Sequence, residues 1–213
     1  MLNKVSARAE RRERAQATRQ RMVAAAYKLF CARGYSVPLT DIAAEAGVAV
    51  QTVYFTFHTK IALLSAVLET AVLGEGDTRA PHEREWFDDL KAEPDPRKAL
   101  RHMVDGTKGI YPRVAPLLDT MRSGDEEVRT LWAHSEQLRV EGYRLVVNEL
   151  ARKGPFRAGL DAAAATDVIL ALLSPDLYIY LAKDRGWPPE RWQRWITNTL
   201  VEAIYGAGGN LDG

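Results

Sequence analysis

The sequence contains little of the chemistry on which most enzymes depend. Cys31 is its only cysteine, which excludes a disulfide within one chain and a cysteine-based metal site and fits a reducing cytoplasm. The four histidines are scattered, and no two of them have the i, i+4 spacing with which a helix presents two ligands to zinc. A nucleophile elbow and a dinucleotide-binding loop are also missing. We therefore predict that the protein is not an enzyme and uses no metal or cofactor.

Long apolar runs and strand patterns are missing as well. No stretch approaches the length of a membrane span, and the first residues lack the apolar core of a signal peptide. Apolar residues recur instead at helical spacing, and no alternating pattern competes with it. The sequence thus predicts an all-α, cytoplasmic protein without a membrane partner.

Charge is distributed unevenly along the chain. The 213 residues carry a formal net charge of +1, but residues 1–34 hold nine Lys and Arg against two Glu, a net charge of +7. Residues 1–73 together carry +5, so the remaining residues carry −4. A positive field on one segment is what attraction to DNA phosphates requires. A solvated basic tail is the alternative explanation of the same count.

Residues 39 to 64 contain the pattern of a helix-turn-helix. Thr40 is a candidate N-cap of the first helix, and Gly47 can adopt the positive φ that a sharp turn needs. A second helix is predicted over residues 50–57, with Val53 and Phe57 pointing inward. In such a motif the second helix is laid in the major groove of DNA.

Residues in and around this motif resemble the TetR family of transcriptional repressors. The matching residues, in order, are Phe30, Gly34, Tyr35, Thr40, Ile42, Ala43, Ala46, Gly47, Val48, Tyr54, Phe57, Thr59, Lys60, Leu63 and Leu64. Three positions depart from the family's pattern. Ala49 stands where a serine often caps the recognition helix, Phe55 where a polar residue is common, and Ile61 where an acidic residue is usual.

The resemblance implies phosphate contacts for Thr40, Tyr54 and Lys60. Independently of it, the amide of Gln51 can pair with adenine through two hydrogen bonds, and Thr52 can contact a phosphate or a thymine methyl group. The residues predicted to bind DNA are Arg14, Thr40, Val50, Gln51, Thr52, Tyr54, Phe55 and Lys60. Core packing of Tyr54 and ordinary exposure of Gln51 are the alternatives.

Two domains are predicted, with a boundary near residue 74. Residues 1–73 form the DNA-binding domain, in which a mobile arm to about residue 18 leads into three helices of the helix-turn-helix unit and a fourth helix over 60–73. Residues 74–213 form a second helical domain, interrupted by several prolines and containing a long helix over about 125–153. A continuous helix could also bridge the two parts.

By the same resemblance, the second domain binds a small molecule and dimerises. Candidate effector contacts are its aromatic, Met and His side chains: Trp86, Met103, Tyr111, Met121, Trp132, His134 and Tyr143. Such residues at helical spacing are more often core, which is the alternative for each. The last two helices carry more apolar surface than one small domain needs, so a four-helix dimer interface is expected there. Its predicted residues are Val168, Leu172, Tyr178, Trp192, Trp195, Ile196 and Leu200.

These features together predict a ligand-responsive transcriptional regulator. It would be a repressor that binds an inverted-repeat operator in double-stranded DNA as a homodimer, and a small apolar or aromatic effector would release it. The alternative is a helical small-molecule-binding protein that no longer recognises DNA specifically.

Overall fold

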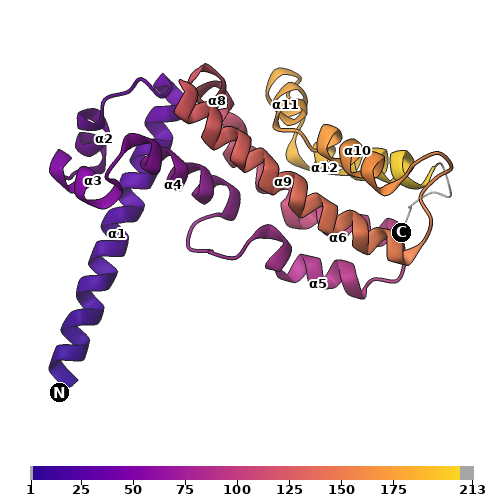
Figure 1. The fold of residues 1–213 in the computed structure, drawn as a ribbon, viewed down its shortest axis with the longest axis horizontal. Coiled ribbons are helices and arrows are strands. Elements are labelled where there is room, and N and C mark those ends of the chain that lie inside the picture. Colours follow the sequence, from indigo (N-terminus) through magenta and orange to yellow (C-terminus); the bar gives the residue numbers. More distant parts are fainter. Residues whose placement is uncertain (1, 207–213) are drawn as a thin grey trace. The chain divides into compact units, whose positions relative to one another are not determined.

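The computed structural model describes the backbone of residues 2–206 and the side chains of residues 8–206, so the last residues of the predicted second domain, 207–213, lie outside the described part. Every regular element within it is helical, and the predicted all-α fold is confirmed (Figure 1). The helices are α1 (Leu2–Arg33), α2 (Leu39–Ala46), α3 (Val50–Phe57), α4 (Lys60–Leu73), α5 (Glu85–Ala92), α6 (Pro96–Thr107), α7 (Tyr111–Val114), α8 (Leu118–Ser123), α9 (Glu126–Lys153), α10 (Ala162–Leu172), α11 (Pro175–Tyr178) and α12 (Pro189–Tyr205). Two 3-10 helices are η1 (Pro81–Glu83) and η2 (Ala115–Leu117), and η3 (Ile179–Asp184) is a π-helix.

The chain divides into two compact units, each built from two separate segments. The first unit contains Met1–Ala71 and Pro116–Trp132, and the second contains Val72–Ala115 and Ala133–Gly213. The sequence-based boundary near residue 74 therefore misses one feature: α8 and the first turns of α9 pack with the amino-terminal helices. A buried hydrogen bond contributes to this packing, because the hydroxyl of Thr120 donates to the carbonyl oxygen of Phe30 at 2.7 Å.

Helix α1 is continuous from Leu2, so the prediction of an arm before the first helix is wrong. No Gly or Pro interrupts residues 2–33, and this segment is rich in Ala and Arg, which are strong helix formers. Its last turns supply Met22 and Phe30 to the core of the first unit, where they are at most 1% exposed together with Ile42, Leu63 and Leu64. Burial of this apolar surface is the main force that holds α1, α2 and α4 together.

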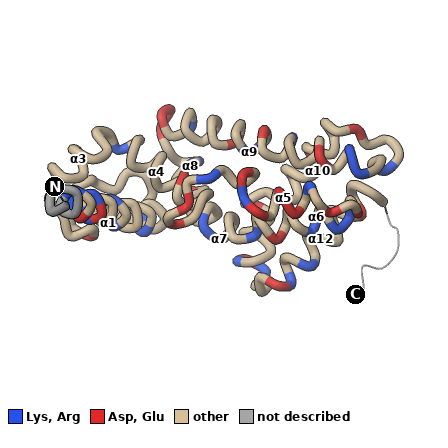
Figure 2. Tube along the Cα trace, turned by 90° about the horizontal axis from the view of Figure 1, so that it is seen from below, with Lys and Arg blue, Asp and Glu red and all other residues tan. Residues whose placement is uncertain are grey.

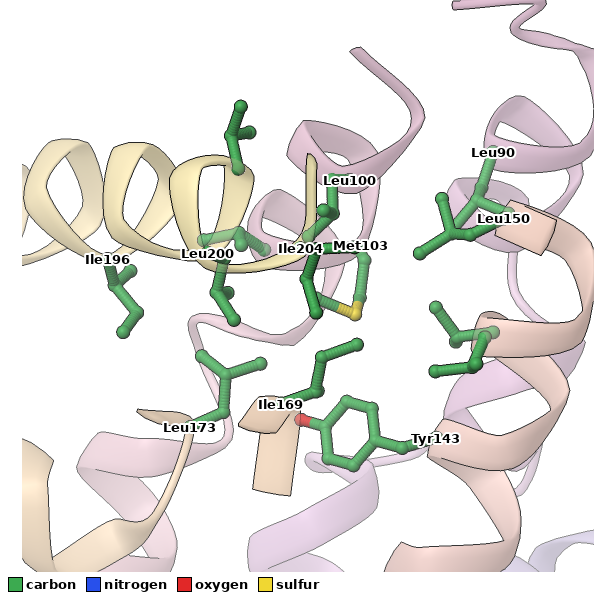
Figure 3. Close-up of a cluster of buried hydrophobic side chains, with 14 of the residues drawn as sticks. Leu90, Leu100, Met103, Tyr143, Leu150, Ile169, Leu173, Ile196, Leu200 and Ile204 are labelled. Atoms are coloured by element: carbon green, nitrogen blue, oxygen red, sulfur yellow. The ribbon is translucent and has the colours of Figure 1, made fainter. Parts of the chain in front are cut away.

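The second unit is organised around one apolar core shared by α5, α6, α9, α10 and α12. Figure 3 shows Ile196, Leu200 and Ile204 of α12 directed at residues of α6 and α10, including Met103 and Ile169. All five side chains are fully buried. The core thus absorbs the apolar face of α12 that the sequence assigned to a dimer.

One segment, Ala162–Asp184, is long and apolar enough to cross a membrane by length and composition alone. The expectation that no stretch approaches that length is therefore wrong. In the structure the segment is divided among α10, α11 and η3, and Ile169, Leu173 and Leu181 are buried in the core of the second unit. A core helix of a soluble protein has the same composition.

Candidate DNA-binding surface and effector site

A tight turn at Gly47 sets the geometry of α2 and α3. Gly47 has φ 64°, and its N–H group donates to the carbonyl oxygens of Ala43 and Ala44. These carbonyl groups at the end of α2 thereby gain a hydrogen-bond donor. Helix α3 then begins at Val50 and ends at Phe57, the predicted bounds. Ala49 precedes α3 and offers no side-chain cap, so the N–H of Thr52 bonds to its backbone carbonyl at 2.9 Å.

Helix α3 buries one face and leaves the other open to solvent. Val53 and Phe57 are buried, whereas Gln51 is exposed, Tyr54 is 52% exposed and Phe55 is 85% exposed. Val50 and Thr52 are half-buried. The exposure of Tyr54 excludes the alternative that it packs in the core. The predicted base-contacting face of α3 is thus available to a partner.

Thr40 does not occupy the predicted capping position. Helix α2 begins at Leu39, two residues before the start that a Thr40 cap would give, with Pro38 in the cap position, and no side chain caps this end. The hydroxyl of Thr40 instead lies 3.4 Å from a carboxylate oxygen of Asp41. Pro38 itself has an extended backbone, with φ −66° and ψ 147°, and the helix begins directly after it.

Lys60, a predicted phosphate contact, packs against an aromatic ring. Its ammonium lies 4.6 Å from the ring centroid of Tyr35, a cation–π contact that attaches the start of α4 to the link after α1. Partial burial lowers the pKa of Lys60, while the nearby charge of Asp125 acts in the opposite direction. Burial and the carboxylates of Asp125 and Glu127 raise the pKa of Tyr35. Sequence reasoning did not identify Tyr35 as the residue that positions Lys60.

Basic residues of α1 have two different roles. Lys28 and Arg33 form ion pairs with Glu45 and Asp41 of α2, at 2.6 and 2.7 Å, and so help to orient α2 on α1. The side chain of Arg14 is 83% exposed and lies 3.8 Å from Glu10. Because exposed ion pairs at that distance are weak, Arg14 can exchange this partner for a phosphate. Helix α3 contains no charged residue, whereas α1 carries both signs with Arg in excess (Figure 2).

Four aromatic residues form a cluster inside the second unit, which we call the aromatic cluster: Tyr111, Tyr143, Tyr178 and Trp192. The hydroxyls of Tyr111 and Tyr143 are 2.7 Å apart, and the ring centroids of Tyr111, Tyr178 and Trp192 are 5.1–6.0 Å from one another. Burial raises the pKa of both Tyr111 and Tyr143, so both are neutral at physiological pH. The indole nitrogen of Trp192 is buried and has no hydrogen-bond partner among the described residues.

The other predicted effector residues do not all join this cluster. Met103 is fully buried in the same core, and Trp86 packs against Phe87 with ring centroids 5.6 Å apart. Met121 and Trp132 belong to the first unit, and His134 is exposed. These three residues therefore lie outside the aromatic cluster, and their predicted contact with an effector stays a prediction. Sequence spacing does not reveal the division, because α9 itself contributes residues to both units.

Four predicted dimer residues are covered by the chain's own core. Ile196 and Leu200 are 0% exposed, Trp192 is 2% exposed and Tyr178 is 7% exposed, so a second copy cannot contact them. Their assignment to an interface is wrong, because helical spacing does not distinguish a face that meets the core from one that meets a partner. The remaining three predicted residues, Val168, Leu172 and Trp195, are half-buried.

Two arginines bind the carboxyl-terminal end of α4. The guanidinium of Arg84 donates to the carbonyl oxygen of Leu73 at 2.6 Å, and that of Arg113 donates to the carbonyl oxygen of Val72 at 3.4 Å. Both contacts lie within the second unit, whereas the rest of α4 belongs to the first. Positive charge is favourable at a helix carboxyl terminus, where the last carbonyls lack partners. Arg113 follows Tyr111 of the aromatic cluster by two residues, a link that sequence reasoning missed.

Comparisons with known proteins agree with this architecture. Residues 22–67 match the family model described as bacterial regulatory proteins, tetR family. The comparison with curated proteins gave no match. Among solved structures, NalD of Pseudomonas aeruginosa, the secondary repressor of the MexAB-OprM multidrug efflux pump, has a TM-score of 0.68 at 18% identity, covering 91% of this chain and 98% of that chain.

Two other similar structures contain bound molecules. FadR from Bacillus subtilis, in complex with stearoyl-CoA, has a TM-score of 0.69 at 18% identity over 87% of this chain and 99% of that chain. A putative regulator from Saccharomonospora viridis, in complex with choline, has a TM-score of 0.61 at 21% identity over 87% and 96%. Residues 22–67 thus match the DNA-binding domain of the tetR family, and the chain as a whole has the fold of these solved structures.

Proposed function

We propose that this protein is a cytoplasmic repressor that binds an inverted-repeat operator as a homodimer and leaves it when a small effector binds. The observation that carries the proposal is the exposed face of α3, on which Gln51, Tyr54 and Phe55 are turned away from the core. In a helix-turn-helix this face enters the major groove.

Phosphate contacts and base contacts would come from different residues. Arg14, Thr40, Tyr54 and Lys60 carry groups that bind phosphate oxygens and so set the register on DNA. Gln51 is the candidate for base recognition, because its amide matches the N6 and N7 edge of adenine. Val50 and Thr52 are half-buried beside it and would complete the contact surface.

A second copy of the chain would cover the apolar surface of α10 and α12. Only 33% of the most apolar 18-residue window within Ala162–Asp184 is buried inside the chain. Val168, Leu172 and Trp195 lie on these helices and keep part of their surface accessible. Covering them in an isologous interface removes apolar area from water and places two α3 helices on one operator.

The aromatic cluster is the candidate effector site. It contains neutral phenols and an indole N–H group that lacks an acceptor, and leaving such a group unpaired costs about 1–3 kcal/mol. An apolar or aromatic molecule with one acceptor oxygen would satisfy that group. Two similar structures were solved in complex with stearoyl-CoA and with choline, which supports a small-molecule ligand for this protein without indicating which one.

Arg113 provides a route from effector to operator. It is held near the aromatic cluster through Tyr111 and bonds to the last turn of α4, the helix that follows the DNA-binding helices. An effector that displaced Tyr111 would move Arg113 and with it the end of α4. Release then requires that the effector bind the low-affinity state better than the DNA-bound state.

Selection from random duplex DNA, followed by gel shifts, tests the proposal. We expect an enriched inverted repeat, and we expect Gln51→Ala to reduce discrimination among its variants by about 1–3 kcal/mol. Gln137→Ala, an exposed glutamine of α9, is the matched control and should bind as the wild type does. The absence of any enriched sequence, together with tight binding of a small molecule, would support the alternative of a binding protein without operator recognition.

A further inference from the structure

Phe55 is the most exposed large apolar side chain among the described residues. It is 85% exposed, compared with 56% for Leu138 and 53% for Tyr180, the next two. It stands on α3, one helical turn after Gln51 and therefore on the same face. On the face proposed to enter the major groove, such an apolar ring can contact an apolar group of the DNA.

The major groove offers one apolar group at its base edges, which is the C5 methyl of thymine. Phe55 has no hydroxyl or amide, so it can neither donate to a phosphate nor pair with a base edge. Its neighbour Tyr54 keeps a phenol and has those options. Contact with a methyl group is therefore the interaction through which Phe55 can contribute to sequence preference.

The spacing to Gln51 limits where that thymine lies. Four residues of an α-helix span about 6 Å, whereas base pairs follow one another at about 3.4 Å. Two side chains one turn apart on α3 thus meet bases about two steps apart. Resting on the proposed function, we infer that Phe55 is a specificity-determining residue that contacts a thymine methyl group in each half-site, about two base pairs from the adenine paired with Gln51.

Base analogues that differ by one methyl group test the proposed contact between Phe55 and thymine. Deoxyuridine differs from thymidine only by the missing methyl, and 5-methylcytosine restores the methyl but replaces the O4 acceptor by an amine. Each thymine of the selected operator is replaced by deoxyuridine in both half-sites, and affinities are measured by fluorescence anisotropy. The proteins compared are wild type, Phe55→Ala and Leu138→Ala, the last being an exposed apolar residue on α9.

At one thymine position in each half-site, removal of the methyl group should lower the operator affinity of the wild type but not that of Phe55→Ala. Loss of one buried methyl should weaken binding about fourfold per half-site, or about 16-fold for the symmetric operator. Phe55→Ala should bind the thymine and deoxyuridine operators equally, and Leu138→Ala should keep the full difference. At that position the wild type should prefer 5-methylcytosine to cytosine, and Phe55→Ala should not.

The results separate this inference from the function on which it rests. If an operator is selected but every deoxyuridine substitution affects wild type and Phe55→Ala alike, Phe55 does not recognise a methyl group, although operator binding stands. If no operator is enriched, the result contradicts both the proposed repressor function and the role of Phe55. Phe55→Leu, which keeps an apolar side chain, should retain part of the thymine preference, and a complete loss in a variant with wild-type helicity would contradict the apolar mechanism.

Discussion

The hydroxyl groups of Tyr111 and Tyr143 lie 2.7 Å apart in the interior of the second unit, although the residues belong to different helices, α7 and α9. Both side chains are at most 8% exposed. The pair is a polar contact inside an apolar core, where each hydroxyl depends on the other.

The free energy of unfolding should fall at alkaline pH because of this pair. Burial raises the pKa of Tyr111 and Tyr143 above the value of about 10 for an unfolded chain. Above pH 10 the folded state therefore keeps protons that the unfolded state loses, whereas below pH 10 both states are protonated and the contribution of the pair to the free energy of unfolding is fully present. Above it, stability should fall by about 1.4 kcal/mol per pH unit for each tyrosine.

Urea unfolding between pH 7 and 11 measures this slope. The double variant Tyr111→Phe/Tyr143→Phe should show a smaller decline above pH 10 than wild type. Tyr180→Phe, at an exposed position, should decline as wild type does. An unchanged slope in the double variant would mean that neither buried phenol controls the alkaline transition.

Two helical glycines should respond oppositely to alanine. A Cβ atom at Gly106 would lie 2.0 Å from Cγ of Trp86, whereas at Gly142 the nearest side-chain atom, of His82, would be 3.9 Å away. Gly106→Ala should therefore displace the indole and destabilise the protein by about 1–3 kcal/mol. Gly142→Ala should stabilise it by up to about 1 kcal/mol through helix propensity. Urea unfolding followed by circular dichroism compares them, and equal effects would be inconsistent with the packing of Trp86 on α6.

Charges on two faces of α12 should separate folding from dimerisation. Leu200→Glu places a carboxylate in the core and should unfold the second unit, because the charge is buried without a partner. Trp195→Glu changes a half-buried side chain and should leave the fold intact while shifting the protein from dimer to monomer. Asn148→Glu, exposed on α9, is the control. Sedimentation with circular dichroism distinguishes these states, and a folded Leu200→Glu monomer would contradict the assignment of Leu200 to the core.

Removing the cation at the end of α4 should uncouple effector binding from operator release. In wild type a saturating effector should weaken operator binding by roughly 5- to 150-fold, and operator should weaken effector binding by the same factor. Arg113→Gln should bind the effector normally, as measured by tryptophan fluorescence, but show a smaller change in operator affinity. Arg101→Gln, an exposed site on α6, should behave as wild type does. Full release by Arg113→Gln would show that the signal takes another route.

Local chemistry was sufficient to predict the helix-turn-helix. The turn depends on the backbone conformation of Gly47, and the buried face of α3 depends on the helical spacing of Val53 and Phe57. Both features are set by residues close together in the sequence and do not require contacts with distant segments. The bounds of α3 and the exposure of its outer face follow from that short range. The full length of α1 was also predictable from the sequence, because residues 2–33 contain no Gly or Pro. The high Arg content of its first half instead led to the prediction of an arm.

Long-range packing determined what an apolar or charged side chain contacts. Leu200 has the pattern of an interface residue and the surroundings of a core residue, because α6 and α10 cover it. Thr120 of α8 donates a hydrogen bond to the backbone of Phe30 in α1. Arg113 donates to the carbonyl oxygen of Val72, which lies 41 residues earlier in the sequence. A helical period specifies which face of a helix is apolar, whereas the segment that covers this face depends on how the whole chain closes around its core.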